Sequence, residues 1–149
     1  MSYLAIAQEI GKVLADVTGS GKVHLYHRHV TELAQLKEYF FDEDQGRLCG
    51  WTISRESFKD DQLTNIENER LSTYVMRGYY SHNDKEASEI GFQDLCDDIA
   101  EAFRPQGNLN ETCEKIYPVQ ARLIGYVEIG GVLNHYCELT LDVQEFLSA

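Results

Sequence analysis

The sequence predicts an α+β domain in which helices pack on one face of a mostly antiparallel, or mixed, sheet. Three stretches repeat their apolar residues with the 3.6-residue period of a helix, and five stretches alternate as strands do. Four of the five strands follow one another in pairs, so the order is α-β-α-β-β-α-β-β and not a strict βαβ alternation. A chain of 149 residues has the usual length of one domain, which we assign to residues 1–149.

The first helix is predicted over residues 3–17, where apolar side chains return every three or four positions: Ile6, Ile10, Val13, Leu14 and Val17. Two glycines in TGSG, residues 18–21, end this helix. Residues 22–29 alternate and contain β-branched and aromatic side chains, which predicts the first strand. A second helix is predicted over residues 32–42, with Thr31 as its N-terminal cap and DEDQG as its end.

Two further strands are predicted over residues 47–55 and 70–80. The first, RLCGWTISR, places Cys49, Trp51 and Ile53 on one face, because alternate side chains of a strand point the same way. The second is apolar on both faces, as is typical of a central strand. The segment between them, residues 56–69 (ESFKDDQLTNIENE), is polar and long for a turn, so we expect it to project as a loop or contact arm.

The main helix is predicted to begin near Asn83, because Asn83 and Glu86 have the spacing of a capping box. Apolar side chains from Phe92 to Phe103 then return at helical spacing, and the opposite face carries Glu89, Asp94, Asp97, Asp98 and Glu101. Pro105 and Gly107 follow the last apolar residue and are expected to end the helix.

The last hairpin is predicted over residues 119–129 and 132–143, with glycines at 130 and 131 between the strands. A two-residue turn would place Leu123 opposite Glu138, so the apolar rows of the two strands would lie on opposite faces. One extra loop residue would place Leu123 opposite Leu139, and we therefore predict an odd-length loop or a glycine bulge. In that register Tyr126 and Tyr136 pair on the outward face, which suits either a protein contact or cross-strand packing.

Composition excludes several classes of partner. The formal net charge is −12 and the pI is about 4.7, so the general surface repels nucleic acid and acidic membranes. The sequence shows no signal peptide and no apolar run of about 18 residues, so we expect a protein of the cytoplasm with no membrane partner. Its four cysteines form no C-x-x-C pair and are expected to be reduced, packed thiols.

Three of the five histidines lie in VHLYHRHV, residues 23–30. On a strand, His27 and His29 would share a face while His24 would point to the other. Two imidazoles fall short of the ligand number of a zinc or iron site unless Glu32 or His82 supplies a third, so we expect no metal. His135 is expected at the edge of the core, bonded to a backbone group.

Known catalytic patterns are absent from the sequence. TGSGK, residues 18–22, lacks the spacing of a phosphate-binding loop, and there is no G-x-S-x-G element. The adjacent carboxylates Asp60–Asp61 and Asp97–Asp98 cannot face each other across a cleft as glycosidase chemistry requires. We therefore expect no enzyme, no catalytic residue and no cofactor.

Three segments in this order carry a resemblance to a known family. They are RLCGWTISR, with Trp51 and Arg55; TYVMRGYYSHNDKEASEIGFQDLCDDIAEAF, a strand running into an acidic helix through Ala87, Ser88 and Phe92; and the closing hairpin ARLIGYVEIGGVLNHYCELTLDVQ. In this arrangement the chain resembles the bacteriophage tail terminator proteins, also called tail completion or tail-to-head joining proteins.

The resemblance implies a structural protein of a phage or prophage, made in the bacterial cytoplasm and incorporated into the virion tail. Such proteins form homo-oligomeric rings, typically hexamers, that cap the tail tube and contact the head connector. An acidic lumen would let DNA pass without binding it. The residues expected at subunit contacts are Arg55, Lys59, Asp60 and Asp61 at the arm, and Tyr126 and Tyr136 on the last hairpin.

Two alternatives stay open at this point. One is a small cytosolic metal-dependent enzyme that uses His27 and His29. The other is a small adaptor or ligand-binding module of similar fold.

Overall fold

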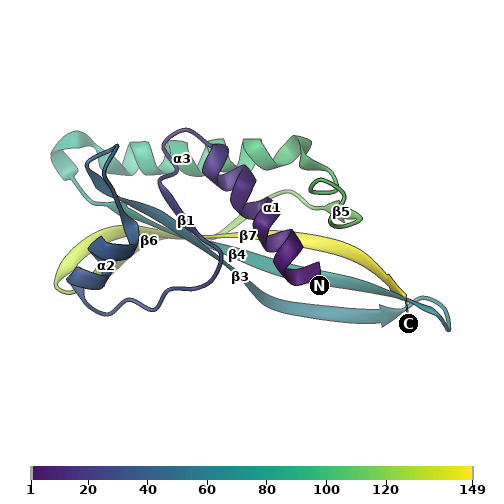
Figure 1. Cartoon of the computed structure of the whole chain (residues 1–149). Coiled ribbons are helices and arrows are strands. Elements are labelled where there is room, and N and C mark those ends of the chain that lie inside the picture. Colours follow the sequence, from purple (N-terminus) through teal and green to yellow (C-terminus); the bar gives the residue numbers. More distant parts are fainter. Residues whose placement is uncertain (1, 149) are drawn as a thin grey trace.

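Four long strands form most of the sheet in the computed structural model, which describes residues 2–148 (Figure 1). They are β3 (Arg47–Gln62), β4 (Glu67–Ser81), β6 (Gln120–Ile129) and β7 (Val132–Ser148). Shorter strands are β1 (Lys22–His24), β2 (Phe41–Asp42) and β5 (Lys115–Ile116). The helices are α1 (Ser2–Asp16), α2 (Leu33–Phe40) and α3 (Ser88–Phe103), with 3₁₀ turns at Asp84–Glu86 and Arg104–Gln106.

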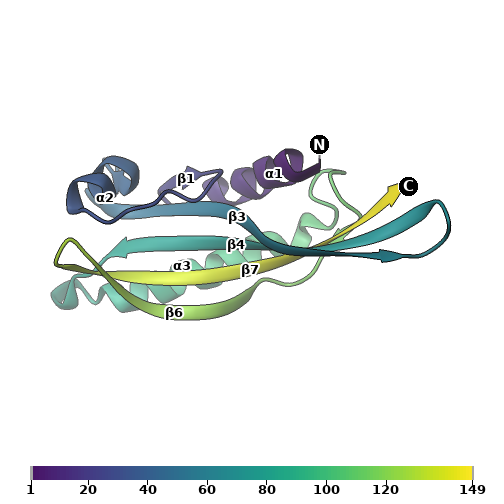
Figure 2. The same cartoon turned by 90° about the horizontal axis from the view of Figure 1, so that it is seen from below.

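The sheet is mixed, since β1 runs parallel to β3 while the other pairs are antiparallel. Figure 2 shows the long strands side by side in the order β3, β4, β7, β6. The predicted α+β class is therefore confirmed, and β4 is central as expected. The predicted order of elements lacked β2 and β5, which are only two residues each. Strands of that length contain too few residues to show an alternation.

The prediction that all helices pack on one face is wrong. α1 and α3 cover one face, which we call the helical face, and α2 lies on the opposite face near one end (Figure 1). The helical face holds the larger core, in which Trp51, Tyr74 and Phe92 are fully or almost fully buried. Because alternate residues of a strand point to opposite faces, Tyr80 of β4 joins this core and Tyr79 joins the smaller core under α2.

The segment predicted as the first strand is mostly loop. β1 ends at His24, because it pairs with β3 only from Lys22 to His24. Residues 25–32 then leave the sheet and lead to α2 on the opposite face (Figure 1). Thr31 does not cap α2: the cap position is Glu32, and the Thr31 amide donates to the Gln35 side chain at 3.2 Å.

The predicted strands 47–55 and 70–80 are both present and both longer than expected. Residues 56–62 continue β3 and residues 67–69 begin β4, so the segment 56–69 is the outer end of this hairpin. We call residues 56–69 the arm. Polar side chains on both faces hid these strand residues from a pattern search, since an arm outside the core has no apolar face.

α3 follows its prediction except at its start. The Asn83 side chain accepts from the Glu86 amide at 3.4 Å, but this cap serves the 3₁₀ turn Asp84–Glu86. Ala87, with a left-handed φ of 53°, separates that turn from α3. The predicted apolar stripe is buried, and the acidic side chains opposite are exposed.

The predicted bulge at the last hairpin is wrong. Gly130 and Gly131 form a two-residue turn between the paired residues Ile129 and Val132, and Leu123 lies opposite Glu138. Both glycines have positive φ, which two-residue hairpin turns favour. The turn geometry therefore outweighed the apolar match. A bulge does occur at the far end, between Ala121 and Leu123, and beyond it Ala121 lies opposite Leu139 and not opposite Leu141 as the predicted register required.

Substitutions at the two turn glycines are expected to differ. At Gly131 a Cβ would meet nothing within 4 Å, so the only cost of Gly131→Ala is that alanine must adopt a left-handed φ. We expect this variant to lose about 1–2 kcal/mol of unfolding free energy. At Gly130 a Cβ would also lie 2.7 Å from the Leu33 nitrogen, so Gly130→Ala loses about 3 kcal/mol or more. Urea unfolding followed by circular dichroism measures both, with Gly131→Asn as the tolerated control. Equal losses at the two positions would contradict this reading of the turn.

Candidate functional site

Two long strands of the described chain each have an edge of ten residues with no neighbouring strand. The outer edge of β6 is free along residues 120–129, because β6 pairs only with β7. The outer edge of β3 is free along residues 53–62, beyond its pairing with β1 and β2. The two edges lie on opposite sides of the sheet (Figure 2). Free backbone donors and acceptors of this kind can pair with a strand of another chain.

The β6 edge is also apolar. Leu123, Ile124 and Tyr126 expose between 36% and 49% of their surface. The two-residue turn accounts for Leu123, which it places opposite Glu138 and away from the apolar row of β7, whereas Ile124 and Tyr126 lie opposite Cys137 and His135. Exposed apolar strand edges are typical of surfaces that contact other proteins.

A chain of ion pairs spans the face opposite the helical face. Arg122 of β6 contacts Glu56 of β3 and, at 2.9 Å, Glu138 of β7, and Arg77 of β4 lies 3.8 Å from Glu138. Hydrogen bonds from Tyr136 and Arg122 lower the pKa of Glu138 against the opposing effect of its partial burial, which is the largest single influence. Since β4 and β7 lie between β3 and β6, the contact of Arg122 with Glu56 shows that the sheet curls around this face.

The arm residues expected at a subunit contact lie together but are paired within the chain. Asp60 accepts two hydrogen bonds from Arg70, at 2.6 and 2.9 Å, and these lower the pKa of Asp60. The Arg55 guanidinium lies 4.5 Å from the ring centre of Phe58. Lys59 lies 3.6 Å from Asp61, and both are exposed.

Tyr126 and Tyr136 do not pair as predicted. In the observed register Tyr126 lies opposite His135, and Tyr136 lies opposite Gly125. Tyr126 is exposed, whereas the Tyr136 hydroxyl donates to Glu138 at 2.7 Å and its ring packs against Tyr79. Burial and the nearby Glu138 carboxylate raise the pKa of Tyr136. Tyr136 thus belongs to packing, and only Tyr126 is available for a contact.

The first three histidines are divided between two environments. The rings of His27 and His29 lie 4.7 Å apart in the loop before α2, both exposed. Burial, Arg77 and His29 lower the pKa of His27, in that order of importance. The His24 Nε2 lies 2.7 Å from the Tyr39 carbonyl oxygen, far from a shared ligand position. Within residues 2–148, no three His, Cys, Asp or Glu side chains are grouped as metal ligands.

A second group of histidines was not predicted from the sequence. His135 is 2% exposed, and its Nε2 lies 2.7 Å from the Ser88 Oγ, so its partner is a side chain and not the expected backbone group. Its ring packs against His82, Tyr126 and Phe92. Ser88 Oγ also accepts from the Asn83 amide at 2.8 Å. This pair ties the start of α3 to the last hairpin, a link between residues 47 positions apart.

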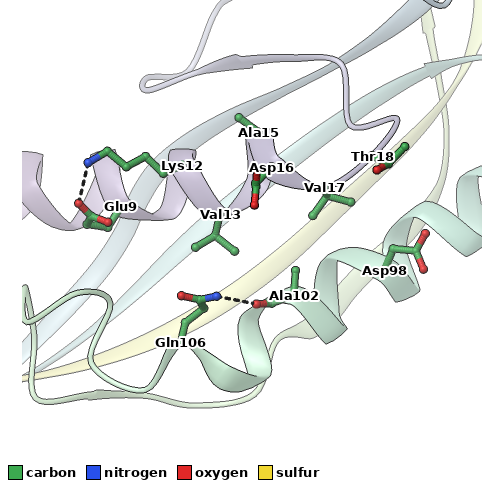
Figure 3. Close-up of a pocket in the computed structure, with 10 residues that line it drawn as sticks. All are labelled: Glu9, Lys12, Val13, Ala15, Asp16, Val17, Thr18, Asp98, Ala102 and Gln106. Carbon is green, nitrogen blue, oxygen red and sulfur yellow. Dashed lines mark hydrogen bonds and ion pairs between the residues drawn. The ribbon is translucent and has the colours of Figure 1, made fainter.

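A groove of about 810 Å³ lies between α1 and α3 (Figure 3). Its polar side chains are mostly occupied, since Lys12 bonds Glu9 at 3.0 Å and the Gln106 amide donates to the Ala102 carbonyl at 3.2 Å. Val13 and Ala102 line its apolar part. Asp16, Thr18 and Asp98 also line it.

A second cavity, of about 570 Å³, lies at the end of the molecule that carries α2, and we call it the α2 cavity. Its apolar walls are Leu33, Phe41, Leu48 and Val132. Lys37 and Arg47 also line it, which is notable in a chain of net charge −12. Sequence reasoning missed this cavity because its residues come from α2, β3, β4 and β7, and only the fold brings them together.

In comparisons with known proteins, no family model matches the sequence, and no curated protein matches it. None of the helices in residues 2–148 combines the length and the apolar character of a membrane span.

Proposed function

We propose that this chain is a non-enzymatic structural subunit that assembles into a ring, caps the tail tube of a phage or prophage and joins it to the head. The observation that carries the proposal is the pair of free strand edges on opposite sides of one sheet. The edges differ in sequence, so a contact between them is head-to-tail, and head-to-tail contacts close into rings when the rotation permits.

The acidic composition supports the same function. A net charge of −12 disfavours adhesion of DNA to the walls of a channel through which it must pass. The partners of such a ring are the tail tube and the head connector, and its place is the virion tail after synthesis in the bacterial cytoplasm. No observation in residues 2–148 favours a metal-dependent enzyme or a small-ligand adaptor over this proposal.

The test is the oligomeric state and its dependence on the β6 edge. We expect the purified chain to form a closed ring at high concentration, measured by light scattering and seen by negative-stain electron microscopy. Leu123→Lys combined with Ile124→Lys should weaken association at least tenfold, because lysines on a free edge oppose strand addition. Both positions are exposed, so the fold should survive, as circular dichroism can check.

A matched control is Leu4→Lys, at an equally exposed leucine of α1. It should associate like the unmodified chain. A strictly monomeric chain up to millimolar concentration would contradict the ring. Function as a cap is then measured by adding the ring to growing tail tubes, whose elongation it should stop.

A further inference from the structure

The tip of the arm exposes two aliphatic side chains at the end of the molecule opposite α2 (Figures 1 and 2). Ile66 is 74% exposed and Leu63 is 49% exposed. Ile66 is the most exposed of the large apolar side chains in the described chain. Exposed aliphatic side chains at a loop tip have no role in folding and are suited to insertion into a partner.

The tip is held in one shape by local hydrogen bonds. The amides of Leu63 and Thr64 both donate to the Glu67 carbonyl, at 3.0 and 3.1 Å. The Ile66 amide donates to the Thr64 hydroxyl at 3.2 Å. A tip ordered in this way loses little conformational freedom on binding, which favours association.

The α2 cavity has the complementary character. Phe41 and Val132 are exposed apolar side chains on its wall, and about 570 Å³ is within the range of pockets that enclose a small ligand. Arg47 is positioned at its side by the Tyr80 hydroxyl, to which it donates, and by Glu86 at 3.6 Å. The arm, by contrast, contains five carboxylates and one lysine, whereas the cavity is lined by Lys37, Arg47 and Glu86, so the net charges of arm and cavity are opposite in sign.

We propose that the arm tip of one copy inserts Ile66 and Leu63 into the α2 cavity of the next copy, with the acidic arm facing Lys37 and Arg47. This contact rests on the proposed ring and specifies how its subunits join. The contact is head-to-tail, because the arm tip and the α2 cavity are two different surfaces, at opposite ends of the molecule.

Ile66→Asp and Val132→Asp test the two sides separately, with Leu4→Asp as the control at an exposed leucine away from both. Association of the purified chain is measured by sedimentation over a concentration series. Each of the two variants should associate at least tenfold more weakly than the unmodified chain, and Leu4→Asp should not differ from it. Circular dichroism confirms that all three are folded.

Mixing the two weakened variants gives a sharper result. Ile66→Asp retains an intact cavity and Val132→Asp retains an intact tip, so an equimolar mixture should form a 1:1 species that neither forms alone. If the unmodified chain associates but either variant associates equally well, the tip contact is wrong while the ring proposal stands. If the unmodified chain is monomeric throughout, both are wrong.

Discussion

Trp51→Ala is expected to lose about 3–5 kcal/mol of unfolding free energy, the largest loss for one substitution in this chain. Trp51 is fully buried and is the only tryptophan. Its ring packs at 6.5 Å from Phe92 and also lies directly over Gly78, its partner on β4. Removing the ring would leave a cavity between α3 and the sheet that neither neighbour can fill.

The contact between Trp51 and Gly78 can also be tested from the Gly78 side. A Cβ at Gly78 would lie 2.5 Å from the Trp51 ring, so Gly78→Ala should lose about 1–3 kcal/mol through overpacking. Combining Gly78→Ala with Trp51→Leu should lose less than the sum of the two single changes, since the smaller side chain makes room for the methyl group. Urea unfolding followed by far-ultraviolet circular dichroism measures all of these, because tryptophan fluorescence is lost with Trp51. Strict additivity would contradict the contact.

The second large effect is expected at His135. His135→Ala should lose about 2–4 kcal/mol at neutral pH, because it removes a buried ring and leaves the Ser88 hydroxyl without that partner. His135→Gln keeps a polar group near Ser88 and should lose less. Thermal unfolding at neutral pH compares the two variants with the unmodified chain.

His135 also makes stability depend on pH. Burial lowers the pKa of His135 below its ordinary value of 6.5, His82 acts in the same direction, and Glu89 opposes them. Ser88, Tyr80, Phe92 and Tyr126 also pack around the ring.

The sign of this dependence follows from the lowered pKa. Well above pH 6.5 the side chain is neutral in both states, and there is no dependence. As the pH falls below 6.5, the unfolded chain takes up the proton first, so unfolding free energy is lost until the folded protein is also protonated.

Unfolding by urea between about pH 8 and pH 5 measures this effect. His135→Gln should flatten the curve below pH 6.5. His27 contributes in the same sense, because its pKa is also lowered, so His27→Gln should flatten the curve further when added to His135→Gln. An unchanged pH dependence in His135→Gln would show that the buried ring is not responsible.

Elements with a core-facing apolar pattern were predictable from the sequence. The stripes of α1 and α3, and the alternation around Trp51 in β3 and Tyr74 in β4, arise because each element must bury one face. The arm and β1 were not predictable in this way. The arm has no buried face, and the alternation of residues 22–29 continues past His24, where pairing with β3 ends.

The candidate site was harder to predict from the sequence than the fold. The resemblance indicated a subunit contact at the arm and at Tyr126, but Lys37, Arg47 and Val132 come together only in the folded chain. Ser88 and His135 are likewise far apart in sequence and adjacent in space. A periodic pattern of residues within one element cannot predict such contacts, because they depend on how different elements pack against one another.

By itself, the sequence determined the α+β class, the central place of β4, the acidic surface and the amphipathic helix α3, because each follows from composition or from a local period. Only the tertiary structure decided which face each helix covers, the register of the last hairpin and the exposure of the β6 edge. The register shows the physical reason most clearly. Two glycines with positive φ closed a two-residue turn between Ile129 and Val132, and that local geometry placed Leu123 opposite Glu138, where it is exposed.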